Sequence, residues 1–461
     1  MNHGGQPPAA GQRIASKAVK ALLRYRRLSP GALLTTSSLL LLAAVLVEAE
    51  PKWLISPDAR EPWRVALDRV ERTREPIMAF VCIENQQLTI MMETETFGQI
   101  DVDKAIRDFL CVRVNALDVR NRPFLDSYQV GRLDLDVNVA DVEHRGEVQA
   151  QGRAHTYPVT LFINPDGQLE HVVYGFATPG DFHQVLERVQ QVMQVHDELR
   201  AKADDAKALA RLGGLYVELQ RYPAGREVLE KALALDQDGK LGTGETALLD
   251  LAITYMAAEE NSKALEAISR HMDTYPESEL RCKAHFLLGG AQLASVEPDR
   301  VTVEELTAKG DAEGAAKARE RLLEGRRRAE EAWSWFESAK GDAPCAKTEW
   351  SDYSLGALAG LRAEMAYEPI AQEVDQLVAE NKIEAAVTKL REFGADKTYQ
   401  GTDRACEALF HAGEILLKAG KRAEALAQWR KLTSDDPKEN PCAHTLWRGQ
   451  AMGAIQENEK P

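Results

Sequence analysis

Cysteine is the residue type best suited to chemistry in this chain, but its six copies are scattered. They are Cys82, Cys111, Cys282, Cys345, Cys406 and Cys442. None forms a Cys-x-x-Cys pair, and no histidine stands at zinc-ligand spacing from any of them. The cysteine spacing therefore predicts neither a zinc site nor a dithiol active site.

The surroundings of the cysteines suggest different environments. Cys345 and Cys442 each follow a proline in a polar segment, so we expect them to be the most accessible. An exported chain could pair some of the six, although pairing does not follow from sequence. Cys82 and Cys111 lie in apolar, strand-like runs and are expected as small buried side chains on neighbouring strands. The alternative, a redox pair of these two, would need accessible thiolates.

The residues that follow the first apolar run decide what chemistry this region could support. Pro76–Ile83 is a continuous apolar run of strand length, as in a strand buried on both faces of a sheet. It leads through Glu84–Thr89 into a helix-like stretch with Met92 and Phe97. Much later, Tyr157–Thr160 places a proline between two strand signals.

This order resembles the thioredoxin fold, in which the first strand ends in Cys-x-x-Cys at a helix start and a cis-proline faces it. The resemblance puts the two family cysteines at Gln86 and Thr89 and the proline at Pro158. Disulfide exchange needs an attacking and a resolving thiol, and an amide and a hydroxyl supply neither. The resemblance thus implies an α/β domain, with a mixed central sheet and flanking helices, and a degenerate site at Gln86, Gln87, Leu88, Thr89 and Pro158.

Two other chemistries find no support in the sequence. Thr89 as a nucleophile would need a general base, and Glu84 is the only nearby acid. An Asp-x-Asp-x-Asn run at 134–138 resembles the start of a calcium loop, but Val139 and Arg145 stand where that loop needs Gly and Glu. No catalytic, cofactor-binding or metal-binding residue is predicted, and no cofactor is implied.

Beyond residue 204 the strand signals end and helical spacing takes over. Small and large apolar residues there are similar in spacing to tetratricopeptide (TPR) repeats at three places. The matching positions are Leu212, Gly213, Tyr216, Gly225, Leu229 and Ala232; Leu251, Ala252, Tyr255, Ala264, Ile268 and Pro276; and Gly413, Ala425, Trp429 and Pro437. Small residues let paired helices approach closely, and proline ends the second helix of a pair.

The stretch between these matches is less regular. Ala284–Ala294 could open another repeat, and helices are expected over Ala312–Lys340, Ser351–Ala366 and Tyr367–Phe393. We interpret Arg326-Arg327-Arg328 as a solvated helix face rather than a phosphate site. The cluster of Trp333, Trp335 and Phe336 is interpreted as core between helices rather than a ligand cage.

The TPR resemblance implies an all-α solenoid whose groove binds a protein or peptide partner. One variant of the family clamps a C-terminal carboxylate with Lys and Asn at fixed groove positions. Those residues are absent here, where the corresponding positions hold Ala210 and Gly214, Leu249 and Ile253, and Phe410 and Glu414. Apolar and mixed contacts are therefore expected to hold a partner.

The N-terminus differs from the rest of the chain. No Asp or Glu occurs from Met1 to Val47, and basic residues precede an apolar run over 31–47. This stretch is either a signal peptide cleaved after Ala49 or an uncleaved inner-membrane anchor with its basic side in the cytoplasm. Both place the later residues outside the cytoplasm, in the periplasm or secreted. The alternative is a soluble protein with a disordered basic tail.

The net charge of −15 argues against nucleic acid as a partner, because phosphate binding needs a basic face. The expected segments are 1–49 (leader or anchor), 50–198 (thioredoxin-like domain) and 199–461 (TPR-like domain). The leading hypothesis is a non-catalytic, extracytoplasmic protein that binds protein partners. The alternatives are a thiol-disulfide oxidoreductase or redox sensor using Cys82 or Cys111, and a structural role in an envelope assembly.

Overall fold

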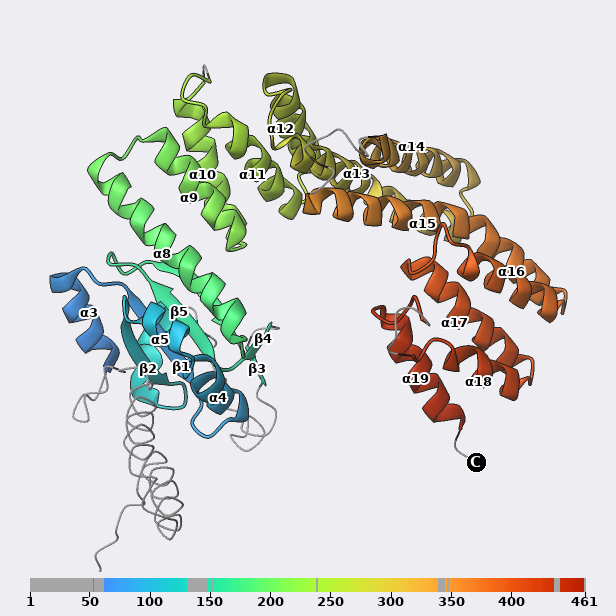
Figure 1. The fold of residues 1–461 in the computed structure, drawn as a ribbon, viewed down its shortest axis with the longest axis horizontal. Helices are drawn as coiled ribbons and strands as arrows, with labels where there is room; N and C mark the ends of the chain where they lie inside the picture. Colours follow the sequence, from blue (N-terminus) through green and yellow to red (C-terminus); the bar gives the residue numbers. More distant parts are fainter. Residues whose placement is uncertain are drawn as a thin grey trace, which may run out of the picture. The chain divides into compact units, whose positions relative to one another are not determined.

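The computed structural model describes residues 53, 62–128, 130, 147–150, 153–237, 239–338, 345, 348–434 and 440–459. The chain forms two compact units, Met1–Met193 and Gln194–Pro461, and the division falls within helix α8, Pro179–Ala201 (Figure 1). The predicted leader or anchor at 1–49 and the calcium-like run at 134–138 lie outside the described residues.

A mixed four-stranded sheet lies at the centre of the first unit. Its strand order is β2-β1-β5-β6, from the strands Leu110–Asn115, Ile77–Cys82, Val159–Ile163 and Leu169–Tyr174. β2 runs parallel to β1, whereas β5 runs antiparallel to it. Every residue of β1 is buried, as its unbroken apolar run predicts. A separate two-stranded ladder joins β3, Glu147–Ala150, to β4, Arg153–Thr156.

Helices cover both faces of this sheet. Side chains alternate along β1, so that Ala79 packs with Trp63 of α3 on one face, while Phe80 contacts Phe97 and through it Phe182 of α8 on the other. The helical elements of this unit, besides α8, are α3 Pro62–Thr73, α4 Gln87–Met91, the π-helix η1 Met92–Thr96, α5 Ile100–Ile106, the 3₁₀ helix η2 Val119–Asn121 and α6 Arg122–Ser127. α4, η1 and α5 form the crossover from β1 to β2.

All regular elements in the described part of the second unit are helices, arranged as hairpins of consecutive helices. The pairs are α9 Ala206–Glu218 with α10 Tyr222–Leu235; α11 Gly244–Ala257 with α12 Asn261–Thr274; α13 Arg281–Ala308 with α14 Ala312–Ser338; α15 Glu349–Ala379 with α16 Ile383–Ala395; and α17 Asp403–Lys418 with α18 Arg422–Arg430. α19, Leu446–Asn458, follows. The first helix of each hairpin also contacts the first helix of the next.

The same turn closes each of these hairpins. Three residues separate the two helices, and the middle one has a positive φ of 57–78° in every case: Gln220, Glu259, Gly310, Asn381 and Gly420. The next residue donates its N–H to a carbonyl five residues back, as Arg221 does to Tyr216 at 2.7 Å. This is the Schellman motif, which satisfies carbonyls left open at a helix end.

Buried small residues set the spacing within each hairpin. The fourth residue of the second helix is always Gly or Ala, at Gly225, Ala264, Ala315, Ala386 and Ala425. One prediction for this unit is wrong: Ser351–Ala366 and Tyr367–Phe393 are not separate helices, because α15 runs unbroken past Pro369. Tyr367 and Val374 are buried in the core shared with α16 and α17, and this packing holds the helix together across the proline.

Candidate functional site

The predicted degenerate site lies at the end of β1. Asn85 has a φ of +64°, a left-handed conformation that Asn tolerates, and it turns the chain into α4. Gln86 is the residue before this helix and is 6% exposed, while Thr89, three residues on, is 1% exposed. Gln87 is exposed and Leu88 is half-buried. The sequence predicted the helix to start after Thr89, but it starts at Gln87.

Gln86 and Thr89 contact each other. The Thr89 hydroxyl donates to the Gln86 side-chain oxygen at 3.4 Å, within the buried interior. The amide nitrogen of Gln86 has no hydrogen-bond partner among the described residues. Glu84, the acid that a hydrolytic threonine would need, instead lies 3.5 Å from Arg113 of β2 in an ion pair. This arrangement brings no nucleophile and base together.

Pro158 lies at the same end of the sheet. β1 pairs with β5 so that Val81 is opposite Val159, and one further step along this register places Pro158 opposite Cys82. The Tyr157–Pro158 peptide bond is cis, and the Pro158 carbonyl accepts from the N–H of Gly175 at 2.7 Å. Both Tyr157 and Pro158 are buried.

Cys82 and Cys111 are free thiols inside the sheet. They lie on the neighbouring strands β1 and β2, but Cys111 is level with Met78, four residues before Cys82. At ~3.3 Å per residue along a strand, the Cα atoms of the two cysteines are roughly 13 Å apart, beyond the ~7 Å Cα–Cα limit for a disulfide. Burial raises the pKa of Cys111 to about 12 and also that of Cys82 to about 12, the latter against the opposing charge of Arg113. Both therefore lack thiolate character at neutral pH.

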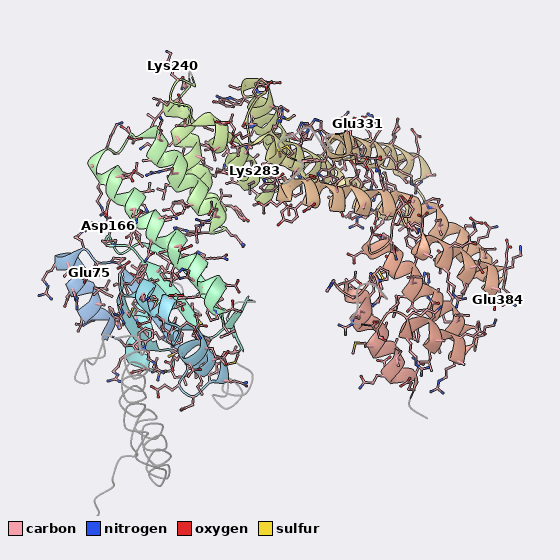
Figure 2. All side chains as sticks on the ribbon, in the orientation of Figure 1. Glu75, Asp166, Lys240, Lys283, Glu331 and Glu384 are labelled. Atoms are coloured by element: carbon pink, nitrogen blue, oxygen red, sulfur yellow. A yellow bond between two sulfur atoms is a disulfide. The ribbon has the colours of Figure 1, made fainter. Side chains whose placement is uncertain are left out.

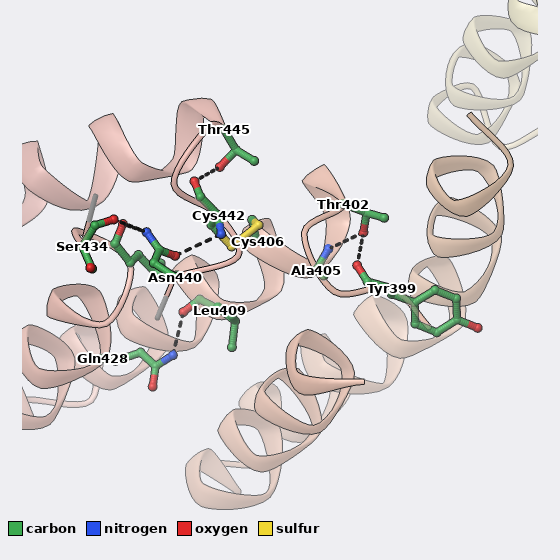
Figure 3. Close-up of a disulfide and its surroundings, with 11 residues drawn as sticks. Tyr399, Thr402, Ala405, Cys406, Leu409, Gln428, Ser434, Asn440, Cys442 and Thr445 are labelled. Atoms are coloured by element: carbon green, nitrogen blue, oxygen red, sulfur yellow. Dashed lines mark hydrogen bonds between the residues drawn. A yellow bond between two sulfur atoms is a disulfide. The ribbon is translucent and has the colours of Figure 1, made fainter. Parts of the chain in front are cut away.

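The other four cysteines form two disulfides in the helical unit, Cys282–Cys345 and Cys406–Cys442. Cys345 and Cys442, predicted to be the most accessible, are 0% and 1% exposed, so that prediction is wrong. Each disulfide fixes the segment after one hairpin to the first helix of that hairpin. Figure 3 shows the second of them, where the Asn440 side-chain oxygen accepts from the Cys442 N–H at 3.0 Å.

The two disulfides belong to a duplicated motif. The sequence Cys-x-Ala-x-Phe-x-x-Gly occurs at 282–289 and 406–413, and Pro-Cys-Ala-x-Thr-x-Trp occurs at 344–350 and 441–447. These identities were readable from sequence by comparing the residues around the cysteines. They show that residues 282–350, which TPR spacing leaves irregular, share a motif with residues 406–447, which include the third TPR match.

Both copies of the motif pack alike. Trp333 donates its ring N–H to the Phe286 carbonyl at 3.1 Å, and Trp429 donates to the Phe410 carbonyl at 3.0 Å. In each copy the glycine of the motif lies under the tryptophan ring, where a Cβ would come within 2.3 Å of the ring nitrogen. The last residue of the duplicated motif is a second tryptophan. The ring of Phe286 lies 5.4 Å from that of Trp350, and the ring of Phe410 lies 5.5 Å from that of Trp447. The duplicated residues are therefore structural.

The charged and aromatic clusters of α14 divide by burial. Arg327 and Arg328 are exposed and pair with acids of their own helix, including Glu331, labelled in Figure 2. Arg326 is instead buried, 3.4 Å from Glu368 and 3.6 Å from Glu364 of α15. The predicted solvated face is thus correct for two of the three arginines.

Trp333 and Phe336 are buried between helices, as predicted. Trp335 is half-buried and stacks on His285 at 4.0 Å. The predicted core position is thus correct for Trp333 and Phe336, while Trp335 lies at its edge.

No family model matches this chain, and no curated protein matches it. Within the described residues, no helix is both long and apolar enough to span a membrane. The described residues also include no group of three or more His, Cys, Asp or Glu side chains placed to hold a metal ion.

Proposed function

We propose that this chain is an extracytoplasmic, non-catalytic protein-binding molecule, in which a thioredoxin-like domain without its cysteine pair precedes a TPR-like solenoid. The observation that carries the proposal is the pair Gln86 and Thr89. These residues occupy the start of the helix after β1, where the family holds its two thiols, and they bond to each other. The two free thiols of the unit are buried elsewhere in the sheet.

The strand arrangement supports the thioredoxin-like assignment. A parallel crossover joins β1 to β2, and an antiparallel hairpin of β5 and β6 follows with Pro158 at its start. The repeated hairpins support the TPR-like assignment, because each has the same turn and the same small fourth residue. Stacked hairpins of this kind offer a long surface for a protein or peptide.

The two disulfides support export. Disulfides persist in oxidising compartments and are rare in the cytosol. The basic, acid-free N-terminus followed by an apolar run favours the same compartment, the periplasm or the exterior. An inner-membrane anchor at 31–47 remains the alternative to a cleaved signal peptide.

Thiol chemistry on the purified protein tests the non-catalytic assignment. We expect no insulin reduction, and alkylation of Cys82 and Cys111 by iodoacetamide at pH 8 should be slow in the folded protein and fast in 6 M guanidinium. The raised thiol pKa values and burial are the reason. Turnover that survives Cys82→Ser and Cys111→Ser, or rapid native labelling of either thiol, would contradict the proposal.

Affinity capture from solubilised envelope tests the binding role. The full chain should retain a defined partner that a chain lacking residues 199–461 does not retain. Equal retention by both, or retention of no defined partner, would favour the purely structural role in an envelope assembly.

A further inference from the structure

His271 of α12 stands at a position that the other hairpins fill with apolar core. It is the twelfth residue after Glu259, the positive-φ residue of its hairpin turn. The twelfth residue after the corresponding turn residue is buried and apolar in each of the other four hairpins: Ala232, Leu322, Phe393 and Leu432. His271 itself is 0% exposed. Hairpin packing therefore calls for an apolar side chain at this depth, and the imidazole is not a requirement of the fold.

The His271 ring is buried without hydrogen bonds. Neither ring nitrogen has a hydrogen-bond partner among the described residues. The ring lies 5.6 Å from that of Tyr275, which follows the end of α12. The neutral imidazole is tolerated in such surroundings, but a bound proton would place a charge in the core that no described group is positioned to accept.

The charged groups around His271 come from α11 and α13, the helices packed most extensively against α12. Glu245 of α11 accepts from the Ser278 hydroxyl at 2.6 Å. Lys283 of α13, labelled in Figure 2, pairs with Asp250 of α11 at 2.7 Å. Burial lowers the pKa of His271 below its ordinary value of 6.5, and it outweighs the backbone carbonyl and carboxylate of Glu245, which act to raise this pKa; the charge of Lys283 lowers it further.

We propose that His271 makes the hairpin of α11 and α12 an acid-sensitive joint of the helical unit, closed when the ring is neutral and opened when it is protonated. Opening would separate the core that Leu249, Ile268 and Leu287 form between α11, α12 and α13. The inference concerns hairpin packing alone, so it stands or falls independently of the proposed partner-binding role.

The direction of the pH effect follows from the two states of the joint. In the open state His271 binds a proton with an ordinary pKa near 6.5, whereas in the closed state it does so only at lower pH. The closed state therefore loses stability as the pH falls below about 6.5, and the loss is complete once the pH is below the pKa of the closed state. Above about pH 7 the ring is neutral in both states and the joint stays closed.

Hydrogen exchange of the full-length chain, followed by peptide mass spectrometry at pH 7.5 and pH 5.0, measures this opening. Rates are divided by the intrinsic rates of unfolded peptides at the same pH. Wild-type peptides from α11 and α12 should exchange about tenfold faster at pH 5.0, since one unit of pKa difference is a factor of ten in the opening equilibrium. His271→Leu, which takes the residue that two other hairpins use, should hold this ratio within about twofold of one. His444→Leu makes the same substitution at an exposed histidine and should keep the wild-type ratio.

Circular dichroism at pH 7.5 establishes that the variants are folded, and His271→Phe, which keeps a planar ring, serves where leucine does not pack. Nuclear magnetic resonance of histidine-labelled protein gives the titration midpoint of His271, whose signal is the one missing from the His271 variants. A midpoint below 6.5 is expected. A midpoint at or above 6.5, no acceleration in the wild type, or the same acceleration in the wild type and the His271 variants would overturn the inference. Loss of the acceleration in His444→Leu, or acceleration spread evenly over the helical unit, would also contradict it.

Discussion

At the scale of single residues, the start of α4 holds two buried polar side chains whose positions two thiols could take. Gln86 and Thr89 are three positions apart, and their side chains already meet at 3.4 Å. Cysteine is smaller than glutamine and close to threonine in size, so both positions can accept it without crowding the buried surroundings. Two side-chain substitutions would therefore place two thiols at this helix start without a change in the backbone.

This argument predicts a gain of function. Gln86→Cys with Thr89→Cys should form a reversible disulfide within one chain and give measurable insulin reduction, because residues three apart at the start of a helix lie close enough for their sulfur atoms to bond. Thiol titration before and after oxidation, together with the insulin assay, measures the result. Gln86→Cys alone is the control, since it has no resolving thiol. A double variant whose new thiols remain reduced under oxidation would show that the helix start is not dithiol-competent.

At the scale of elements, sequence predicted what depends on local pattern and failed on what depends on packing between helices. The run Pro76–Ile83 predicted β1 because two-sided burial leaves no polar alternation. The burial of Cys345 and Cys442 could not be predicted, since it depends on how the segment after one hairpin folds back on its first helix. A groove of about 790 Å³, lined by Lys382 of one hairpin and Lys418 of the next, likewise depends on how separate hairpins stack.

The hairpin turns were also missed, because three of their left-handed residues are Gln220, Glu259 and Asn381 rather than glycine. Gln220→Gly should raise the free energy of unfolding by about 0.5–1 kcal/mol, since glycine takes a positive φ without a steric cost. Gly420→Ala is the matched opposite and should lower it by about 1 kcal/mol. No atom lies within 4 Å of the position that the added Cβ would take, so backbone strain alone is measured.

Urea denaturation of both variants gives the two values. A loss of stability in Gln220→Gly, or no change in Gly420→Ala, would mean that the turn relaxes and that its left-handed residue does not constrain the hairpin.

A charge network joins three of the helices and gives the unit a pH dependence. Glu364 of α15 accepts from Arg404 of α17 at 2.8 Å and lies 3.6 Å from the buried Arg326 of α14. Burial acts to raise the pKa of Glu364, but the hydrogen bond and charge of Arg404, with that of Arg326, outweigh it and leave this pKa lowered. A lowered pKa in the folded state adds stability above the unfolded value of ~4.3, and that stability is lost as the pH falls through the folded value.

Glu364→Gln should therefore lower the free energy of unfolding at pH 7 by about 1–2 kcal/mol, because it leaves two guanidinium groups without their shared carboxylate. The difference from the wild type should shrink below about pH 4. Urea denaturation at pH 7 and pH 3.5 measures both effects. Glu331→Gln, in an exposed pair with Arg327, should change stability by less than about 0.5 kcal/mol. A pH-independent difference between Glu364→Gln and the wild type would contradict this account.

At the scale of the whole molecule, both disulfides lie in the described part of the helical unit. Because disulfides are broken by reduction, the stability of this unit depends on the redox state of its surroundings. The disulfides close loops with sequence separations of 63 and 36 residues. Loop-closure entropy alone gives about 4 kcal/mol for each, within the range observed for native disulfides. A reducing cytosol would remove this contribution, which is a physical argument in favour of the proposed export.

The duplicated motif makes that dependence testable with matched variants. Cys406→Ala with Cys442→Ala, and separately Cys282→Ala with Cys345→Ala, should each lower the melting temperature of the helical unit, because each removes one closed loop. Dithiothreitol should lower the wild-type melting temperature further than either pair of substitutions and leave the fourfold alanine variant unchanged. Circular dichroism melts with and without the reductant give these values. If thiol titration shows four released thiols while the wild-type melt does not shift, the disulfides do not stabilise the helical unit, and the stability argument for an oxidising compartment fails with them.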